Sequence, residues 1–102
     1  MQLIEDTALH IEDEIEDAKR YAEEALALKD TNKAAADLRF KLANEELQHM
    51  AMLHAEIVKM IEKYKAENGE PPADMMYRYD YIHKIHIRKA AEVKGRLAMY
   101  QG

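Results

Sequence analysis

The stretch Asn44-Glu45-Glu46-Leu47-Gln48-His49-Met50-Ala51-Met52 places a carboxylate and an imidazole three residues apart. With about 3.6 residues per helical turn, Glu46 and His49 lie on one face of a helix and can reach a common point. The other positions of that face are apolar: Leu38, Leu42, Leu53, Ile57, Met60 and Tyr64. A buried charge is costly unless it is paired or binds a metal. A polar pair within a surface that should pack against other helices is therefore a candidate either for pairing with another charge or for metal binding.

The composition is typical of long helices. Charged residues make up 34% and apolar residues 48% of the 102 residues, with only three glycines and two prolines. A chain of this length forms one domain, with a modest core or half of a shared one. We therefore expect residues 1–102 to form a single all-α domain.

Charge and residue usage exclude several classes of protein. The net charge of −5 and the lack of a basic block predict no nucleic-acid partner. The absence of cysteine excludes disulfides, iron–sulfur clusters and thiolate zinc sites. No apolar run approaches about 18 residues, and no signal pattern opens the chain, so we expect no membrane partner. The expected location is cytoplasmic, either free or inside a larger protein compartment.

The spacing of apolar residues predicts a helical hairpin. Intervals of three and four residues predict a first helix over about residues 5–28. The polar segment Lys29–Lys33 supplies capping residues and a short turn, so the second helix should run antiparallel over about residues 32–67. Asn68-Gly69 is a usual signal for the end of a helix.

A third helix is expected over about residues 74–100, after the rigid break Glu70-Pro71-Pro72. The sequence leaves open whether this helix packs on its own hairpin or on a neighbouring chain. A lone hairpin would leave the apolar stripe of the second helix only partly covered. We therefore expect two hairpins to dimerise into a ferritin-like four-helix bundle.

Bundles of that kind hold two irons with one Glu from each of two helices and a Glu-x-x-His pair from each of the other two. In the first helix, Glu14 lies beside the apolar centre, one turn from Ile11 and Ala18. Glu12 flanks the opposite edge and is the second choice, while Tyr21 lies two turns beyond Glu14 on its side.

One hairpin thus carries half of the ligand set, and a two-fold symmetric dimer would supply the other half. Mixed carboxylate and imidazole ligands favour iron, with manganese or zinc as substitutes, over calcium and magnesium.

The segments Asp13–Tyr21 and Asn44–Met52 resemble the encapsulated ferritin family. The resemblance implies a hairpin protomer, a di-iron ferroxidase centre formed across a dimer, a higher homo-oligomer and an encapsulin-type shell as partner. The iron ligands that it implies are Glu14, Glu46 and His49. It also implies that Tyr21 is a site-adjacent tyrosine with a catalytic role, and that Asp13 and Glu16 lie near the metal entry path.

The chain departs from that family in two places. Arg20 stands where the family has a tryptophan, so the surroundings of the metal should differ. The segment Leu97–Gly102 does not resemble the peptide that targets cargo to an encapsulin shell, so the sequence leaves enclosure in a shell open.

Two other functions stay open at the level of sequence. Glu-x-x-His pairs arise by chance in Glu-rich helices, and buried polar groups can serve only to specify helix pairing. The chain would then be a non-catalytic helical assembly protein, or a dimer with a structural metal. His83 and His86, with Asp80, form a weaker candidate site, and an interface role is the commoner fate of such histidines. We assign no role to His10 and His54, which lie off the apolar centres.

Overall fold

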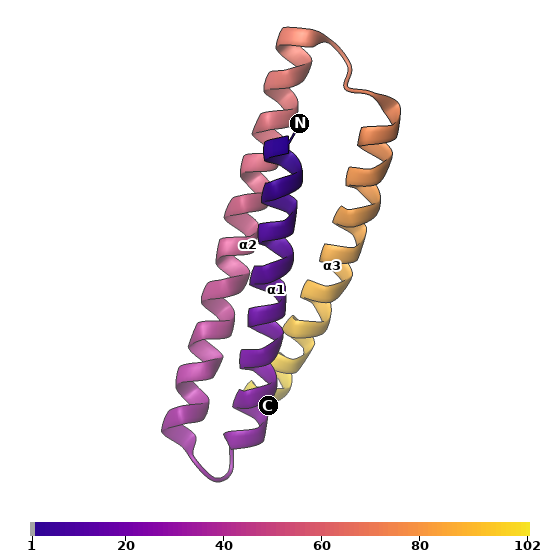
Figure 1. The fold of residues 1–102 in the computed structure, drawn as a ribbon. Helices are drawn as coiled ribbons and strands as arrows, with labels where there is room; N and C mark the ends of the chain where they lie inside the picture. The colour runs from indigo at the N-terminus through magenta and orange to yellow at the C-terminus, as the bar shows by residue number, and fades with distance from the viewer. Residues whose placement is uncertain (1) are drawn as a thin grey trace.

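The computed structural model describes residues 2–102, which form three α-helices and no strand (Figure 1). Helix α1 (Gln2–Leu28) and helix α2 (Lys33–Asn68) form an antiparallel hairpin, and α3 (Ala73–Gln101) returns alongside α1. The body is elongated, with extents of 56 × 19 × 18 Å. The prediction of an all-α fold is confirmed.

Local signals set both ends of α2. The side chain of Asn32 accepts a hydrogen bond from the backbone N–H of Ala35 (3.2 Å) and caps the first turn. At the other end, Gly69 has a φ of 81°, a left-handed conformation that suits glycine, and its N–H donates to the carbonyl of Lys65 (3.0 Å). The turn and the stop expected from the sequence are thus both confirmed.

Small side chains let α1 and α2 pack closely in the half of the hairpin nearest its turn. The buried alanines are Ala18, Ala22 and Ala25 on α1 and Ala36 and Ala43 on α2. Alanine combines the highest helix propensity with a short side chain, so it favours the helices and allows their backbones to approach each other.

The other half of the hairpin has a core of larger side chains. Its buried isoleucines are Ile4, Ile11 and Ile15 on α1 and Ile57 and Ile61 on α2. Each such side chain contributes about 1.5–3 kcal/mol on burial, so this half supplies much of the stability of the hairpin.

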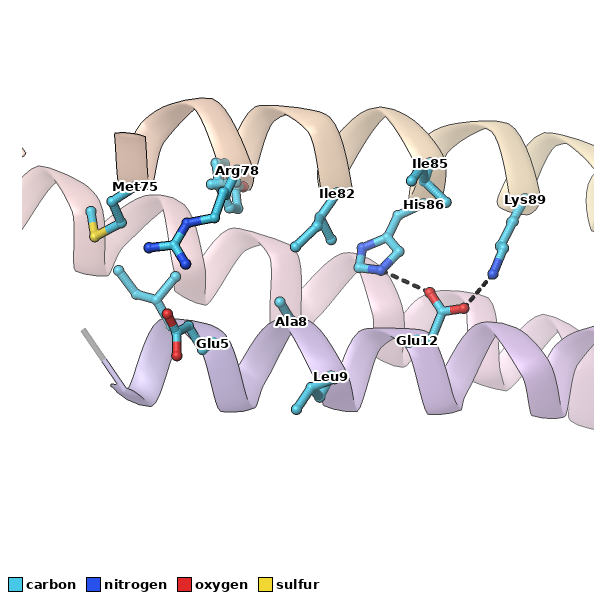
Figure 2. Close-up of a pocket in the computed structure, with 12 residues that line it drawn as sticks. Glu5, Ala8, Leu9, Glu12, Met75, Arg78, Ile82, Ile85, His86 and Lys89 are labelled. Carbon is cyan, nitrogen blue, oxygen red and sulfur yellow. Dashed lines mark hydrogen bonds and ion pairs between the residues drawn. The ribbon is translucent and has the colours of Figure 1, made fainter. Parts of the chain in front are cut away.

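Helix α3 is attached mainly through its C-terminal half. Val93 and Leu97 join the alanine-rich core, and Tyr100 stacks on Phe40 with 5.0 Å between ring centroids. The hydroxyl of Tyr100 also donates to Asp37. Toward its N-terminal half α3 diverges from the hairpin, leaving an apolar groove of about 570 Å³ between α1 and α3 (Figures 1 and 2).

The predicted apolar stripe of α2 is only partly covered in the single chain. Ile57 is buried, whereas Leu38 is 52% exposed. In the first half of α2 the buried strip runs instead through Ala36, Ala43 and Leu47, because α1 covers one side of α2 and α3 has few contacts with it. The side of α2 that carries Leu38 is therefore open.

Over residues 2–102, none of the three helices combines the length and the apolarity needed to cross a bilayer.

Truncating Ile15 should destabilise the fold strongly. Its side chain is 1% exposed, and replacing a buried isoleucine by alanine costs about 2–5 kcal/mol. The control is Ile87→Ala on α3, where the side chain is 56% exposed and the loss should stay below about 1 kcal/mol. Urea unfolding followed by circular dichroism measures both values. Equal losses would contradict the core described above.

Candidate metal centre

Three donor side chains meet where α1 and α2 lie against each other. Glu14 of α1 and Glu46 and His49 of α2 each offer one ligand atom, and these atoms all lie within 4.8 Å of one another. Among the residues that the structure describes, no other set of three acidic or histidine side chains meets this criterion. The hairpin thus brings the Glu-x-x-His pair of one helix against a single glutamate of the other.

The spacing of the donors suits a shared cation. The Nδ1 atom of His49 lies 3.3 Å from Oε2 of Glu14 and 3.9 Å from Oε1 of Glu46. Donors that bind one metal at about 2.0–2.2 Å are themselves roughly 3–3.6 Å apart. The two carboxylates are 15% and 18% exposed, whereas the imidazole is 53% exposed. The site is therefore covered by the hairpin on one side and open on the other.

The two carboxylates shift each other's pKa in opposite directions. A hydrogen bond with Glu14, together with burial and the Glu14 charge, raises the pKa of Glu46 to about 7. The same hydrogen bond, assisted by His49 and His10 against burial, lowers the pKa of Glu14. Two carboxylates this close cannot both ionise without a cost, so near neutral pH the pair holds a proton unless a cation replaces it.

Within residues 2–102, no lysine or arginine forms an ion pair with Glu14 or Glu46, and both are paired only with histidines. Other acidic residues of α1 do have a basic partner: Glu12 and Glu16 pair with Lys89, Glu23 with Arg96 and Glu24 with Arg39. A partly buried charge needs compensation. Over the described residues, the carboxylate pair at the candidate site therefore has no permanently charged side chain to compensate it.

The donor set fits a transition metal. Two carboxylates and one imidazole suit iron, manganese or zinc, whereas calcium and magnesium favour all-oxygen sites. Three protein donors also leave coordination positions for another ligand. One chain therefore offers three candidate ligands, and the cluster is open on the side of His49.

The other residues that the resemblance places near the metal are less closely associated with the three donors. Tyr21 is partly buried against the alanine-rich core, and the guanidinium of Arg20 lies 5.0 Å from the centre of its ring. Glu16 pairs with Lys89 of α3 (3.5 Å), and Asp13 is exposed. Over the described residues, the side chains of Tyr21, Glu16 and Asp13 form no hydrogen bond with the three donors.

Glu12, the second-choice ligand, lies on the side of α1 that faces α3 (Figure 2). Its Oε2 lies 3.0 Å from Nε2 of His86, and its other oxygen accepts from the ammonium of Lys89. His86 is 6% exposed, and burial lowers its pKa against the opposing effect of Glu12. Because Lys89 already neutralises Glu12, this group fastens α3 to α1, and Glu14 is the only glutamate of α1 in the three-residue cluster over the described residues.

Two histidines to which sequence analysis gave no role make specific contacts. The Nε2 atom of His10 lies 3.1 Å from Oε1 of Glu14, a contact that the four-residue spacing within one helix could have indicated. The ring of His54 stacks on that of His83 with 4.2 Å between centroids, and this pairing depends on how α3 meets α2, which the sequence leaves open.

Comparisons of the chain with protein-family models, with curated protein sequences and with solved structures give no match. We therefore infer the function from the chemistry and geometry of the candidate site.

Replacing Glu46 by glutamine should stabilise the metal-free protein at about pH 8. A carboxyl group whose pKa is raised on folding contributes stability below its ordinary pKa of 4.5, and that contribution is lost as the pH rises through about 7. Thermal unfolding of Glu46→Gln should therefore occur above that of the unaltered protein at about pH 8 and near it at about pH 4.5.

The matched control is Glu45→Gln, which removes the neighbouring carboxylate outside the cluster. If Glu45→Gln and Glu46→Gln shift the melting temperature equally at about pH 8, ionisation of Glu46 beside Glu14 does not destabilise the protein as expected.

Proposed function

We propose that this protein is a ferritin-like ferroxidase, which oxidises Fe(II) at a di-iron centre on a two-fold dimer interface and so serves iron storage or detoxification. The observation that carries the proposal is the cluster of Glu14, Glu46 and His49, whose two carboxylates have no lysine or arginine counter-ion in the described chain. The resemblance of their two segments to encapsulated ferritins supports iron over other cations.

The open side of the cluster supports a dimer. His49 is 53% exposed and the open face of α2 carries Leu38, which is 52% exposed. A second copy related by a two-fold axis would present the same residues, because an isologous interface is self-complementary. Two Glu and Glu-x-x-His sets would then complete the ligand pattern of a ferritin-like bundle.

Each donor has a role set by its chemistry. The carboxylates of Glu14 and Glu46 replace their shared proton with Fe(II) and, as anionic oxygen donors, stabilise the higher charge of Fe(III) more than that of Fe(II). His49 supplies a neutral nitrogen donor on the open side. With iron bound there, oxidation by dioxygen would take one electron from each Fe(II), and the two anionic carboxylates would favour the Fe(III) that forms.

Helix α3 supplies none of the three donors, and we assign it to higher assembly. Its exposed apolar side chains are Tyr77, Tyr81, Ile82, Ile87 and Met99. The proposal extends to a higher homo-oligomer in the cytoplasm, either free or within an encapsulin-type shell, although the chemistry at the iron centre does not require a shell.

Glu46→Gln should abolish iron loading. Glutamine has nearly the same shape but cannot provide a second anionic oxygen donor, and changes in the outer shell alone cost about 10–100-fold in affinity. We expect affinity for Fe(II) under anaerobic conditions to fall by at least that factor, and ferric formation after admission of oxygen to cease. Glu45→Gln should keep both properties. Equal iron binding in Glu46→Gln and the unaltered protein would refute the proposal.

Metal binding without oxidation of Fe(II) would instead favour a structural metal-binding dimer. Absence of metal from both proteins would favour a helical assembly protein in which Glu46 and His49 specify pairing.

Leu38→Asp should weaken dimerisation and iron binding together. Leu38 is already half exposed in the single chain, so the change leaves the hairpin intact while placing a charge on the proposed interface. Sedimentation velocity and iron titration should both shift, and Ile87→Asp on α3 should leave iron binding unchanged. A Leu38→Asp monomer that binds iron like the unaltered protein would show that the site does not need a second chain.

A further inference from the structure

We propose that His10 is a positioning residue for the metal centre, which holds one oxygen of Glu14 so that Glu14 binds metal only through the other. This inference rests on the proposed metal-binding function and adds a fourth residue to the site. It concerns a histidine outside the two segments that resemble encapsulated ferritins.

The two oxygens of Glu14 face different histidines. Oε1 lies 3.1 Å from Nε2 of His10, one turn earlier on α1, and Oε2 lies 3.3 Å from Nδ1 of His49 on α2. The group of ligand atoms within 4.8 Å of one another comprises Glu14, Glu46 and His49. His10 thus contacts the carboxylate without belonging to that group, which is the arrangement of a hydrogen-bond donor to a ligand.

Chemistry fixes the direction of the hydrogen bond. A carboxylate that binds a metal is ionised and accepts hydrogen bonds only, so the Nε2 atom of His10 carries the hydrogen. A free carboxylate can rotate, chelate one cation or bridge two. With Oε1 engaged by His10, Glu14 presents Oε2 alone, in the orientation that faces His49.

Such outer hydrogen bonds have a measurable effect on metal affinity. They orient the ligand before the metal arrives, and removing one commonly lowers affinity about 10–100-fold. His10 and Glu14 are on the same helix, four residues apart, so their geometry depends on α1 and survives changes in the packing of α3.

The test is a titration of the full-length protein with Co²⁺ in competition with a chromophoric chelator. His10→Ala should bind Co²⁺ about 10–100-fold more weakly than the unaltered protein, with an unchanged visible spectrum because the ligands are the same. His10→Gln should restore affinity to within about threefold, because its amide nitrogen can donate from a similar position. His54→Ala, which removes an imidazole elsewhere in the chain, should bind normally.

Three outcomes would overturn the inference. Normal Co²⁺ affinity in His10→Ala would show that His10 does not position Glu14. A failure of His10→Gln to restore affinity, with an altered visible spectrum in His10→Ala, would show that His10 is itself a ligand. Equal losses in His10→Ala and His54→Ala would indicate a general effect of removing histidine. Normal binding in Glu46→Gln would refute the proposed metal centre itself, so the two failures are distinguishable.

Discussion

The candidate site depends on one constraint, the electrostatic repulsion between the carboxylates of Glu14 and Glu46. The two carboxylates lie on facing helices and are mostly covered, yet over residues 2–102 their ion-pair partners are histidines alone, and the pKa of Glu46 is raised to about 7. Elsewhere on α1, Glu12, Glu23 and Glu24 are each matched by a lysine or arginine from α2 or α3. A protein that left such a pair uncompensated would lose stability near neutral pH, unless a cation bound there. The carboxylate pair that would bind a metal therefore lowers the stability of the metal-free protein near neutral pH.

The rest of the hairpin holds that arrangement in place. Buried alanines bring α1 and α2 close on one side of the site, and the isoleucine core anchors them on the other. The contacts of Glu12 with His86 and Lys89 attach α3 to the opposite side of α1, which keeps α3 away from the cluster. Glu12 and Glu14 are only two residues apart, but the side chain of Glu12 contacts α3 and that of Glu14 contacts α2. This division leaves the side of the hairpin that carries Glu14, Glu46 and His49 free of α3, and it is there that we propose a second copy binds.

Much of this organisation could be predicted from residue spacing. The three helices, the Asn32 cap and the Gly69 stop follow from local propensities, and the one-turn spacing of Glu46 and His49 placed them on a common face. The choice of Glu14 depended on its position beside the apolar centre of α1. The return of α3 along α1 could not be predicted, because the two prolines allow several directions. Nor could the stacking of His54 on His83, which depends on that return. His10 was overlooked because it lies off the apolar face, although its distance of four residues from Glu14 was visible.

Anomalous X-ray diffraction from crystals grown with Fe(II) under anaerobic conditions tests the central claim most directly. The account predicts a pair of iron peaks a few ångströms apart on a two-fold axis, with Glu14, Glu46 and His49 of both chains as ligands. Iron bound elsewhere would contradict it. So would a lysine or arginine of a partner chain lying between Glu14 and Glu46, because the carboxylate pair would then be a pairing contact with its positive charge already supplied.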